Sequence, residues 1–286
     1  YSNDSCIVSQ IRQLYVDSSY IILSDRNGNG ICVFQNNKLL CNIAHYGRGP
    51  QEFITITGFC LDKSNKHICN ESRKLVKYTY NGAFVGKYPL PDLMRSFTNV
   101  KGKFICIQPA YLRKMRSGIW TTDSEGKFGK VLVPENSDNV YEALYPHYFN
   151  YNDEGISYYD RYDNRLFFIT PDSAYLKYRF NLIPAMPRAL KRNEDKGVQD
   201  YFMLATCYDF EKYILLFYGS TKEFYQVLYN KADSTYRVTE DLVNDLLPDD
   251  KNEVSEHYID PYTLAVEMSA EENDYNLHLQ ILHIKK

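Results

Sequence analysis

Residues 20–40 of the chain read YIILSDRNGNGICVFQNNKLL, and a similar pattern returns at 67–85 (HICNESRKLVKYTYNGAFV) and at 104–128 (FICIQPAYLRKMRSGIWTTDSEGKF). Each stretch holds an apolar run, a polar break, a second apolar run and a turn before the chain continues. Apolar runs of this length, divided by turn residues, indicate short β-strands that belong to a repeated unit.

The turns within these three units fall at Asn37, Gly82 and Gly126, which are 45 and 44 residues apart. A repeat of about 40–50 residues with several strands per unit is typical of a β-propeller. Looser copies follow at 155–169, 213–229 and 262–282. We therefore predict an all-β fold, a six-bladed β-propeller that spans residues 1–286 as a single domain. Its strands are often apolar on both faces, as expected for sheets with neighbours on both sides.

Two segments interrupt the repeat. Pro184–Gln199 carries two prolines and a run of charged residues. Thr239–Glu256 places leucine and valine at helical spacing before a proline. We predict both segments to be surface excursions, the second with a short amphipathic helix.

The bulk composition restricts the class of protein and of partner. Hydrophobic residues make up 44% of the chain and charged residues 24%, which suits a globular core and excludes a disordered chain. Aromatic residues reach 15%, including 27 Tyr, and they favour β-structure. A formal net charge of −3 without a basic cluster argues against nucleic acid as a partner. No apolar run approaches the ~20 residues that a membrane-spanning helix needs.

Residues 47–53 read GRGPQEF and lie between the first two units. Together with Phe59–Asp62, Val76–Tyr78 and the Asn81–Gly82 turn, this segment resembles an NHL-type repeat. More closely, it resembles the linker of six-bladed propellers that are common in Bacteroidetes, which usually have glycine where this chain has Gln51. The resemblance implies an exported protein of the periplasm or cell surface, lipid-anchored through a segment outside this chain. It implies no reaction.

In a propeller, the linkers between blades and the loops after each second strand lie on one face, here called the linker face. We predict the ligand site there, because polar groups converge around the mouth of the central channel. The candidate residues end these second strands, follow them in the adjoining loops or, in the case of Arg48, belong to the linker between the first two units. They are Asp25, Glu71, Gln108, Tyr159 (or its neighbour Asp160), Tyr218 and Glu267, together with Arg48, Arg113 and Arg161. The structural alternative is that they are hydrated loop residues or ion pairs between blades.

Tyrosines gather between Tyr141 and Tyr162, and they offer a second hint about the ligand. Exposed tyrosines stack on sugar rings or peptides because each combines a large apolar face with a polar hydroxyl. The structural alternative is that these rings pack between blades and direct their hydroxyls to solvent.

Known catalytic motifs do not occur in this sequence. It contains no nucleophile elbow, no zinc-protease motif, no phosphate loop and no dinucleotide fingerprint, and we predict neither a cofactor nor a resident metal. We predict a non-catalytic, envelope-associated propeller that binds a glycan, a peptide or a partner protein on its linker face. The alternative is a metal-dependent lactonase or hydrolase, with Asp25, Glu71 and Glu267 holding the ion in the central channel. A plain scaffold is the third possibility.

The seven cysteines include two pairs that predicted hairpins bring together. The turns place Cys32 opposite Cys41, and Cys60 opposite Cys69. Directly opposed strand residues have Cα atoms about 4.5–5.5 Å apart, which overlaps the geometry of a disulfide bond. We interpret both pairs as adjacent thiols, with disulfide bonds as the alternative.

Overall fold

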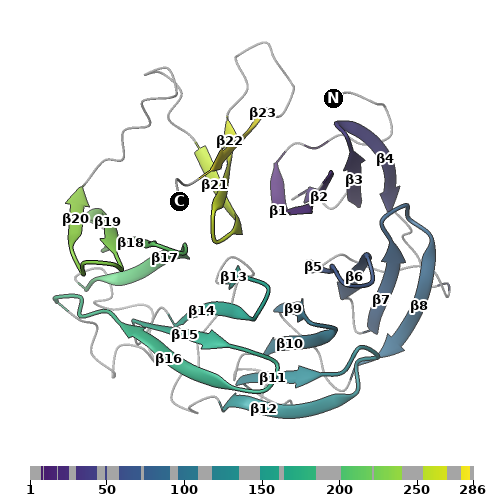
Figure 1. Ribbon diagram of the computed structural model, residues 1–286, viewed down its shortest axis with the longest axis horizontal. Helices are drawn as coiled ribbons and strands as arrows, with labels where there is room; N and C mark the ends of the chain where they lie inside the picture. The colour runs from purple at the N-terminus through teal and green to yellow at the C-terminus, as the bar shows by residue number, and fades with distance from the viewer. Residues whose placement is uncertain are drawn as a thin grey trace.

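The structure, a computed structural model, consists of six small antiparallel sheets arranged in a ring as the blades of a propeller (Figure 1). It describes residues 8, 10–17, 19–25, 30–43, 49, 58–71, 74–90, 96–108, 118–134, 149–160, 164–184, 201–220, 222–239, 254–268 and 278–283. Within these ranges every regular element is a β-strand. The prediction of an all-β, six-bladed propeller is confirmed.

Each blade is one sheet whose strands follow one another in chain order from the centre to the rim. Blade 1 contains β1 (Ile11–Asp17), β2 (Tyr20–Asp25), β3 (Ile31–Gln35) and β4 (Lys38–Ile43). Blade 2 contains β5 (Gly58–Asp62), β6 (His67–Glu71), β7 (Lys74–Thr79) and β8 (Phe84–Pro89). Blade 3 contains β9 (Ser96–Val100), β10 (Lys103–Gln108), β11 (Gly118–Thr122) and β12 (Phe128–Pro134).

The second half of the ring repeats this order. Blade 4 contains β13 (Phe149–Tyr151), β14 (Ile156–Asp160), β15 (Arg165–Ile169) and β16 (Ala174–Arg179). Blade 5 contains β17 (Met203–Asp209), β18 (Tyr213–Gly219), β19 (Phe224–Asn230) and β20 (Tyr236–Thr239). Blade 6 contains, in the described residues, β21 (Val254–Asp260), β22 (Thr263–Met268) and β23 (His278–His283).

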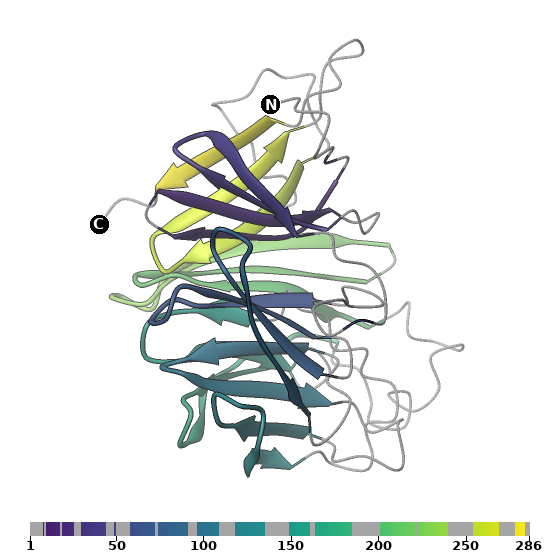
Figure 2. The same ribbon diagram turned by 90° about the vertical axis from the view of Figure 1, so that its right-hand side faces the viewer.

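Seen from the side, the strands run between the two faces of a thick disc (Figure 2). The second strand of each blade ends at the linker face. The hairpins that join the first and second strands lie at the opposite face, here called the hairpin face. A residue's place along its strand therefore tells which face of the disc its side chain is near.

Burial depends on the place of a strand within its blade. Strands β5, β11 and β14 are buried along their whole length, whereas the rim strands β16 and β20 are largely exposed. Apolar clusters lie between blades: Ile22 and Phe59 belong to one between blades 1 and 2. Ile11 and Ala265 belong to another, which closes the ring between blades 1 and 6. Because inner strands have a neighbouring blade on each side, they are apolar on both faces, as predicted.

The predicted turns have the backbone conformation that their residue types favour. Asn36 and Asn37 in the β3–β4 hairpin have φ of 48° and 63°. Gly82 and Gly126, in the corresponding hairpins of blades 2 and 3, have φ of 82° and 83°. Asparagine and glycine are the residues that most readily adopt positive φ, so these turns set the repeat.

The cysteine predictions are partly correct. Cys60 lies directly opposite Cys69, as predicted. A β-bulge between Val33 and Phe34 shifts the other hairpin, so Cys41 lies opposite Val33, and its predicted pairing with Cys32 is wrong. Cys41 and Cys60 are thiols, so neither predicted pair forms a disulfide bond. Cys32 is nevertheless disulfide-bonded, to a cysteine outside the described side chains, and the hairpin spacing did not predict this bond.

Most of the two predicted excursions lies outside the described residues. Pro184 is described, and Val254–Glu256 belong to β21, but the segment predicted to be helical is not described. In the part of the chain that is described, no helix has the length and apolar character needed to cross a membrane.

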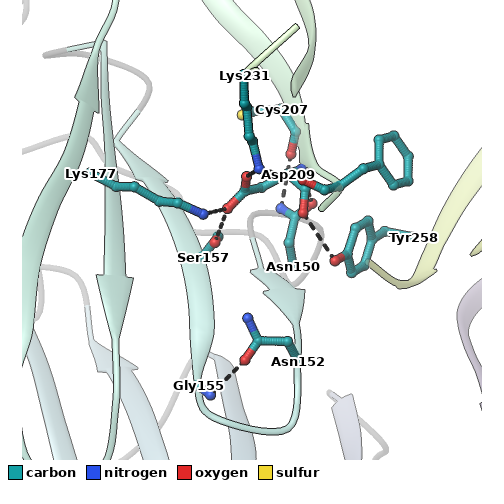
Figure 3. Close-up of polar contacts among 10 residues, drawn as sticks. Asn150, Asn152, Gly155, Ser157, Lys177, Cys207, Asp209, Lys231 and Tyr258 are labelled. Carbon is teal, nitrogen blue, oxygen red and sulfur yellow. Dashed lines mark hydrogen bonds and ion pairs between the residues drawn. The ribbon is translucent and has the colours of Figure 1, made fainter. Parts of the chain in front are cut away.

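Neighbouring blades are also joined by side-chain amides that pair with the backbone of the next blade. The Asn150 Nδ2 donates to the Cys207 carbonyl oxygen at 2.9 Å, and its Oδ1 accepts the Asp209 N–H at 2.8 Å (Figure 3). Gln13 makes the same two hydrogen bonds with the backbone of Phe59. Its Nε2 donates to the Phe59 carbonyl oxygen at 3.3 Å, and its Oε1 accepts the Phe59 N–H at 2.9 Å. We call this two-bond contact an amide bracket. It satisfies buried backbone groups of innermost strands that face another blade.

Replacing Asn150 tests the amide bracket. We expect Asn150→Leu to lower the free energy of unfolding by about 2 kcal/mol or more, because each buried polar group left without a partner costs about 1–3 kcal/mol. Urea denaturation measures the change. Asn152→Asp is the matched control, since its side-chain oxygen accepts the Glu154 and Gly155 N–H groups within one turn and aspartate preserves that acceptor. Equal stability of the two variants would show that the bracket contributes nothing.

Candidate functional site

The predicted site residues that end second strands hold equivalent positions in successive blades. Asp25, Glu71, Gln108 and Asp160 are the last residues of the second strands β2, β6, β10 and β14. Tyr218 and Glu267 are the next-to-last residues of the corresponding strands β18 and β22. These positions therefore share the linker face, as predicted from the repeat.

Three of the predicted residues, and Asp160, have described side chains. The Asp25 carboxylate is buried, and its Oδ1 accepts the Gln10 N–H at 3.0 Å. Tyr159 is buried and donates from its hydroxyl to the Ala205 carbonyl of blade 5 at 2.8 Å. Asp160 forms a 2.7 Å ion pair with Arg165 inside blade 4. Of this set, Tyr218 alone is partly exposed.

The remaining predictions fall outside what the structure describes. Arg48, Arg113 and Arg161 are not described, and neither are the side chains of Glu71, Gln108 and Glu267. Of the tyrosine-rich segment, Tyr158 and Tyr159 are described and buried. Within the described residues, no three His, Cys, Asp or Glu side chains converge on a common metal position.

Tyr218 belongs to an aromatic cluster at the linker end of blade 5. Its ring stacks on Tyr225, with centroids 5.5 Å apart and planes 23° apart. Phe202 meets both rings edge-on, at 5.7 Å from each centroid. All three rings are half-buried, and the neighbouring Phe224 is exposed. Burial, followed by the nearby Tyr236, raises the pKa of Tyr218, so its hydroxyl stays neutral and is able to donate and accept hydrogen bonds.

A second cluster, at the hairpin end of the seam between blades 4 and 5, was not predicted. Its centre is Asp209, the last residue of β17, whose side chain is 2% exposed (Figure 3). The Lys177 Nζ lies 2.5 Å from its Oδ2, and the Lys231 Nζ lies 2.6 Å from its Oδ1. The Ser157 hydroxyl donates to Oδ2 as well, and Lys231 also donates to the Phe210 carbonyl. We call Asp209, Lys177, Lys231 and Ser157 the Asp209 cluster.

The Asp209 cluster contains two lysines and only one carboxylate to balance their charge. Burial raises the pKa of Asp209, but the charges and hydrogen bonds of Lys231 and Lys177 outweigh burial, and the pKa lies below its usual value. Burial lowers the pKa of Lys231, although Asp209 opposes this effect. With both lysines protonated, two cations share one carboxylate.

The other titratable groups beside Asp209 remain neutral. Burial, followed by the charge of Asp209, raises the pKa of the Cys207 thiol well above its usual value. The same two causes, in the same order, raise the pKa of Tyr258 well above its usual value. The Tyr258 hydroxyl donates to the Asp209 carbonyl at 3.2 Å. A protonated thiol is a poor nucleophile, so the arrangement favours binding and structural roles over covalent chemistry.

One sequence signal pointed towards the Asp209 cluster. The innermost strands of blades 1, 2, 5 and 6 all end in aspartate, at Asp17, Asp62, Asp209 and Asp260. Asp62 and Asp260 accept N–H groups of their own turns, and Asp17 accepts the Tyr80 hydroxyl. Asp209 instead binds Lys177 of β16 and Lys231 of the β19–β20 turn, and the repeat pattern gives no sign of this difference.

Neutralising Asp209 tests its role in joining the blades. We expect Asp209→Asn to lower the free energy of unfolding by about 3 kcal/mol or more, because the two lysines lose the charge that compensates their burial. Urea denaturation at neutral pH measures the loss. Asp172→Asn is the matched control: Asp172 also binds two lysines, Lys103 at 3.0 Å and Lys130 through its carbonyl, but it is fully exposed. The control should unfold like the unmodified protein.

The pH dependence gives the same prediction a second readout. Since the pKa of Asp209 is lower in the folded protein than in the unfolded chain, its stabilisation is complete above the ordinary carboxyl pKa of about 3.9. It is lost as the pH falls through the folded-state pKa. The stability gap between the unmodified protein and Asp209→Asn should therefore shrink below about pH 4. A gap that stays constant from pH 7 to pH 3 would contradict the assignment.

Comparison with known proteins places the chain in a family. A search of curated proteins finds no match to this chain. Among solved structures, it is similar to a Bacteroides fragilis protein described as a "Putative exported protein", with 16% identity, 93% of this chain and 81% of the other covered, and a TM-score of 0.74. It is also similar to PorZ of Porphyromonas gingivalis, with 10% identity, 98% and 34% covered, and a TM-score of 0.48. At 16% identity, the similarity to the Bacteroides fragilis structure shows the fold alone. The family model described as "Domain of unknown function (DUF4934)" matches residues 2–272, nearly the whole sequence, and the chain therefore belongs to the DUF4934 family.

Proposed function

We propose that this protein is a non-catalytic, envelope-associated propeller that recognises its ligand, a glycan, a peptide or a partner protein, on the linker face. The observation that carries the proposal is the aromatic cluster of Phe202, Tyr218 and Tyr225 at the linker end of blade 5. The paired strands β18 and β19 carry the two tyrosines, and Phe202 directly precedes β17 of the same blade, so one sheet holds the three rings in place before any ligand arrives. Rigid aromatic groups with a hydroxyl at one end are typical of recognition surfaces.

The chemistry of the cluster favours an oligosaccharide as the first ligand to test. Sugar rings present flat C–H faces, which pack on aromatic rings, and hydroxyl groups, which need hydrogen-bonding partners. Tyr218 and Tyr225 supply both, because each combines an apolar ring with a hydroxyl. A peptide with proline or aromatic residues would use the same features.

Three observations support export of the protein. The GRGPQEF segment at 47–53 resembles the linker of NHL-like propellers of Bacteroidetes, which are exported and often lipid-anchored. The similar Bacteroides fragilis structure is described as exported. Cys32 is disulfide-bonded, and disulfide bonds persist mainly in oxidising compartments such as the periplasm and cell surface. We propose the same location, and a lipid anchor outside this chain, for this protein.

Removing the rings of the cluster tests the ligand site. We expect Tyr218→Ala and Tyr225→Ala each to weaken ligand binding by about 30-fold, the loss of about 2 kcal/mol expected for an aromatic hot spot. An oligosaccharide and peptide array identifies the ligand, and isothermal titration calorimetry measures the loss. Tyr262→Ala is the matched control, because this exposed tyrosine lies in the β21–β22 hairpin at the other face. If the array ligand binds all three variants equally well, the cluster is not its site.

The disulfide bond gives a separate test of export. Alkylation of the unfolded, unreduced protein followed by peptide mass spectrometry should label Cys41 and Cys207 and leave Cys32 unlabelled. The protein should be isolated from the envelope fraction of its native cells, so that the bond reflects its own compartment. Labelling of Cys32 to the same extent as Cys41 would argue against an oxidising location.

A further inference from the structure

In the part of the chain that the structure describes, the two lysines of the Asp209 cluster have N–H donors without an acceptor. An ammonium group has three N–H donors. Within the described residues, Lys177 uses one of them, on Asp209, while Lys231 uses two, on Asp209 and on the Phe210 carbonyl. Both side chains reach solvent, with 27% of Lys177 and 16% of Lys231 exposed. Three donors and one uncompensated positive charge therefore remain available to an incoming group.

Asp209 also holds the two ammonium groups close together. They contact different oxygens of one carboxylate, at 2.5 and 2.6 Å, so a single small anion is able to reach both. Such an anion would complete an alternating arrangement of two negative and two positive groups. Because the lysines are partly buried, solvent and salt screen this attraction less than they screen an ordinary surface pair.

Aromatic side chains of both blades flank the lysines. From blade 4, Phe168 lies under the Lys177 ammonium at 5.7 Å, and Tyr175 packs on Phe168 at 5.6 Å. From blade 5, Tyr229 lies opposite Tyr236 in the β19–β20 pairing, so the two share one face of the sheet. That face is directed towards blade 4, because Tyr229 meets Tyr178 of β16 at 6.0 Å.

Two of these rings are available to a ligand at the hairpin end of the seam. Tyr175 is 53% exposed and Tyr236 is 68% exposed. Tyr236 begins β20 and Tyr175 lies near the start of β16, so both are near the hairpin face, like Lys231. The seam thus presents two cationic groups and two exposed tyrosine rings near the hairpin face of the disc.

We propose that the hairpin end of the seam between blades 4 and 5 is a second binding site, which takes an anionic saccharide. Lys177 and Lys231 hold the carboxylate of a uronic-acid unit, and Tyr175 and Tyr236 pack on the sugar rings beside it. Asp209 positions the two ammonium groups without contacting the ligand. An acidic peptide would pair with the two lysines, but it has no flat C–H faces to pack on the exposed rings of Tyr175 and Tyr236. A saccharide that carries a carboxylate matches both the lysines and the rings.

Isothermal titration calorimetry of the folded protein with an oligogalacturonate tests this proposal. Oligogalactose, which lacks the carboxylates, and hexaglutamate, an acidic peptide, are the comparison ligands. We expect saturable binding of the oligogalacturonate and no detectable binding of the oligogalactose. Binding of oligogalactose as tight as that of the charged oligosaccharide, or tighter binding of hexaglutamate, would overturn the proposal, and so would no binding of oligogalacturonate at all.

Matched variants locate the site. Lys177→Gln removes one positive charge but keeps an N–H donor for Asp209, and we expect it to weaken oligogalacturonate binding at least tenfold. Lys130→Gln makes the same change on blade 3, where Lys130 donates to the Asp172 carbonyl, and it should leave binding unchanged. Equal losses in the two variants would mean non-specific charge attraction and would refute the site.

Two further variants keep the test decisive. Tyr236→Ala changes a side chain that is mostly in solvent, so it tests ring packing even if Lys177→Gln fails to fold, and we expect at least a fivefold loss of affinity. Unchanged affinity in Tyr236→Ala would overturn the stacking arrangement. Tyr218→Ala, at the other face, should leave oligogalacturonate binding intact. This last variant separates the second site from the linker-face site, because each fails or succeeds with its own set of variants.

Discussion

Each blade of this propeller has two apolar faces, and a closed ring is the arrangement that buries both of them. The clusters between blades 1 and 2, and between blades 1 and 6, show the result: the core is divided among the seams. Strands such as β5 and β14 are buried along their whole length because a neighbouring blade covers each face, whereas the rim strands β16 and β20 are largely exposed. Because polar backbone groups are also enclosed there, the seams need hydrogen-bonding partners as well as apolar contacts, and Gln13 and Asn150 supply them.

The turns of the repeat could be predicted from the sequence, because each turn depends on the types of a few adjacent residues. The turns at Asn37, Gly82 and Gly126 depend on residues that accept positive φ, and they lie where the spacing placed them. A β-bulge in blade 1 could not be predicted, since it adds one residue to a strand without a marker of its own. That single residue moved Cys41 from opposite Cys32 to opposite Val33.

The candidate sites differ in how much the sequence revealed of them. Tyr218 was predicted because repeat alignment places it at the end of a second strand, and its neighbour Tyr225 follows from the pairing of β18 with β19. The Asp209 cluster was missed because its members come from four strands or turns of two blades. Ser157 and Lys177 stand 52 and 32 residues before Asp209, and no local pattern links them. Long-range packing alone brings such charges together.

The amide bracket has a consequence for how such a ring diverges over evolutionary time. Gln13 and Asn150 pair with the main chain of the adjoining blade, so each contact is indifferent to the side chains of its neighbour. A blade is therefore free to change its surface residues, and thereby its specificity, without a compensating change across the seam. Interfaces built from backbone contacts make each blade a semi-independent unit of variation, which suits a scaffold that presents different ligand surfaces on its two faces.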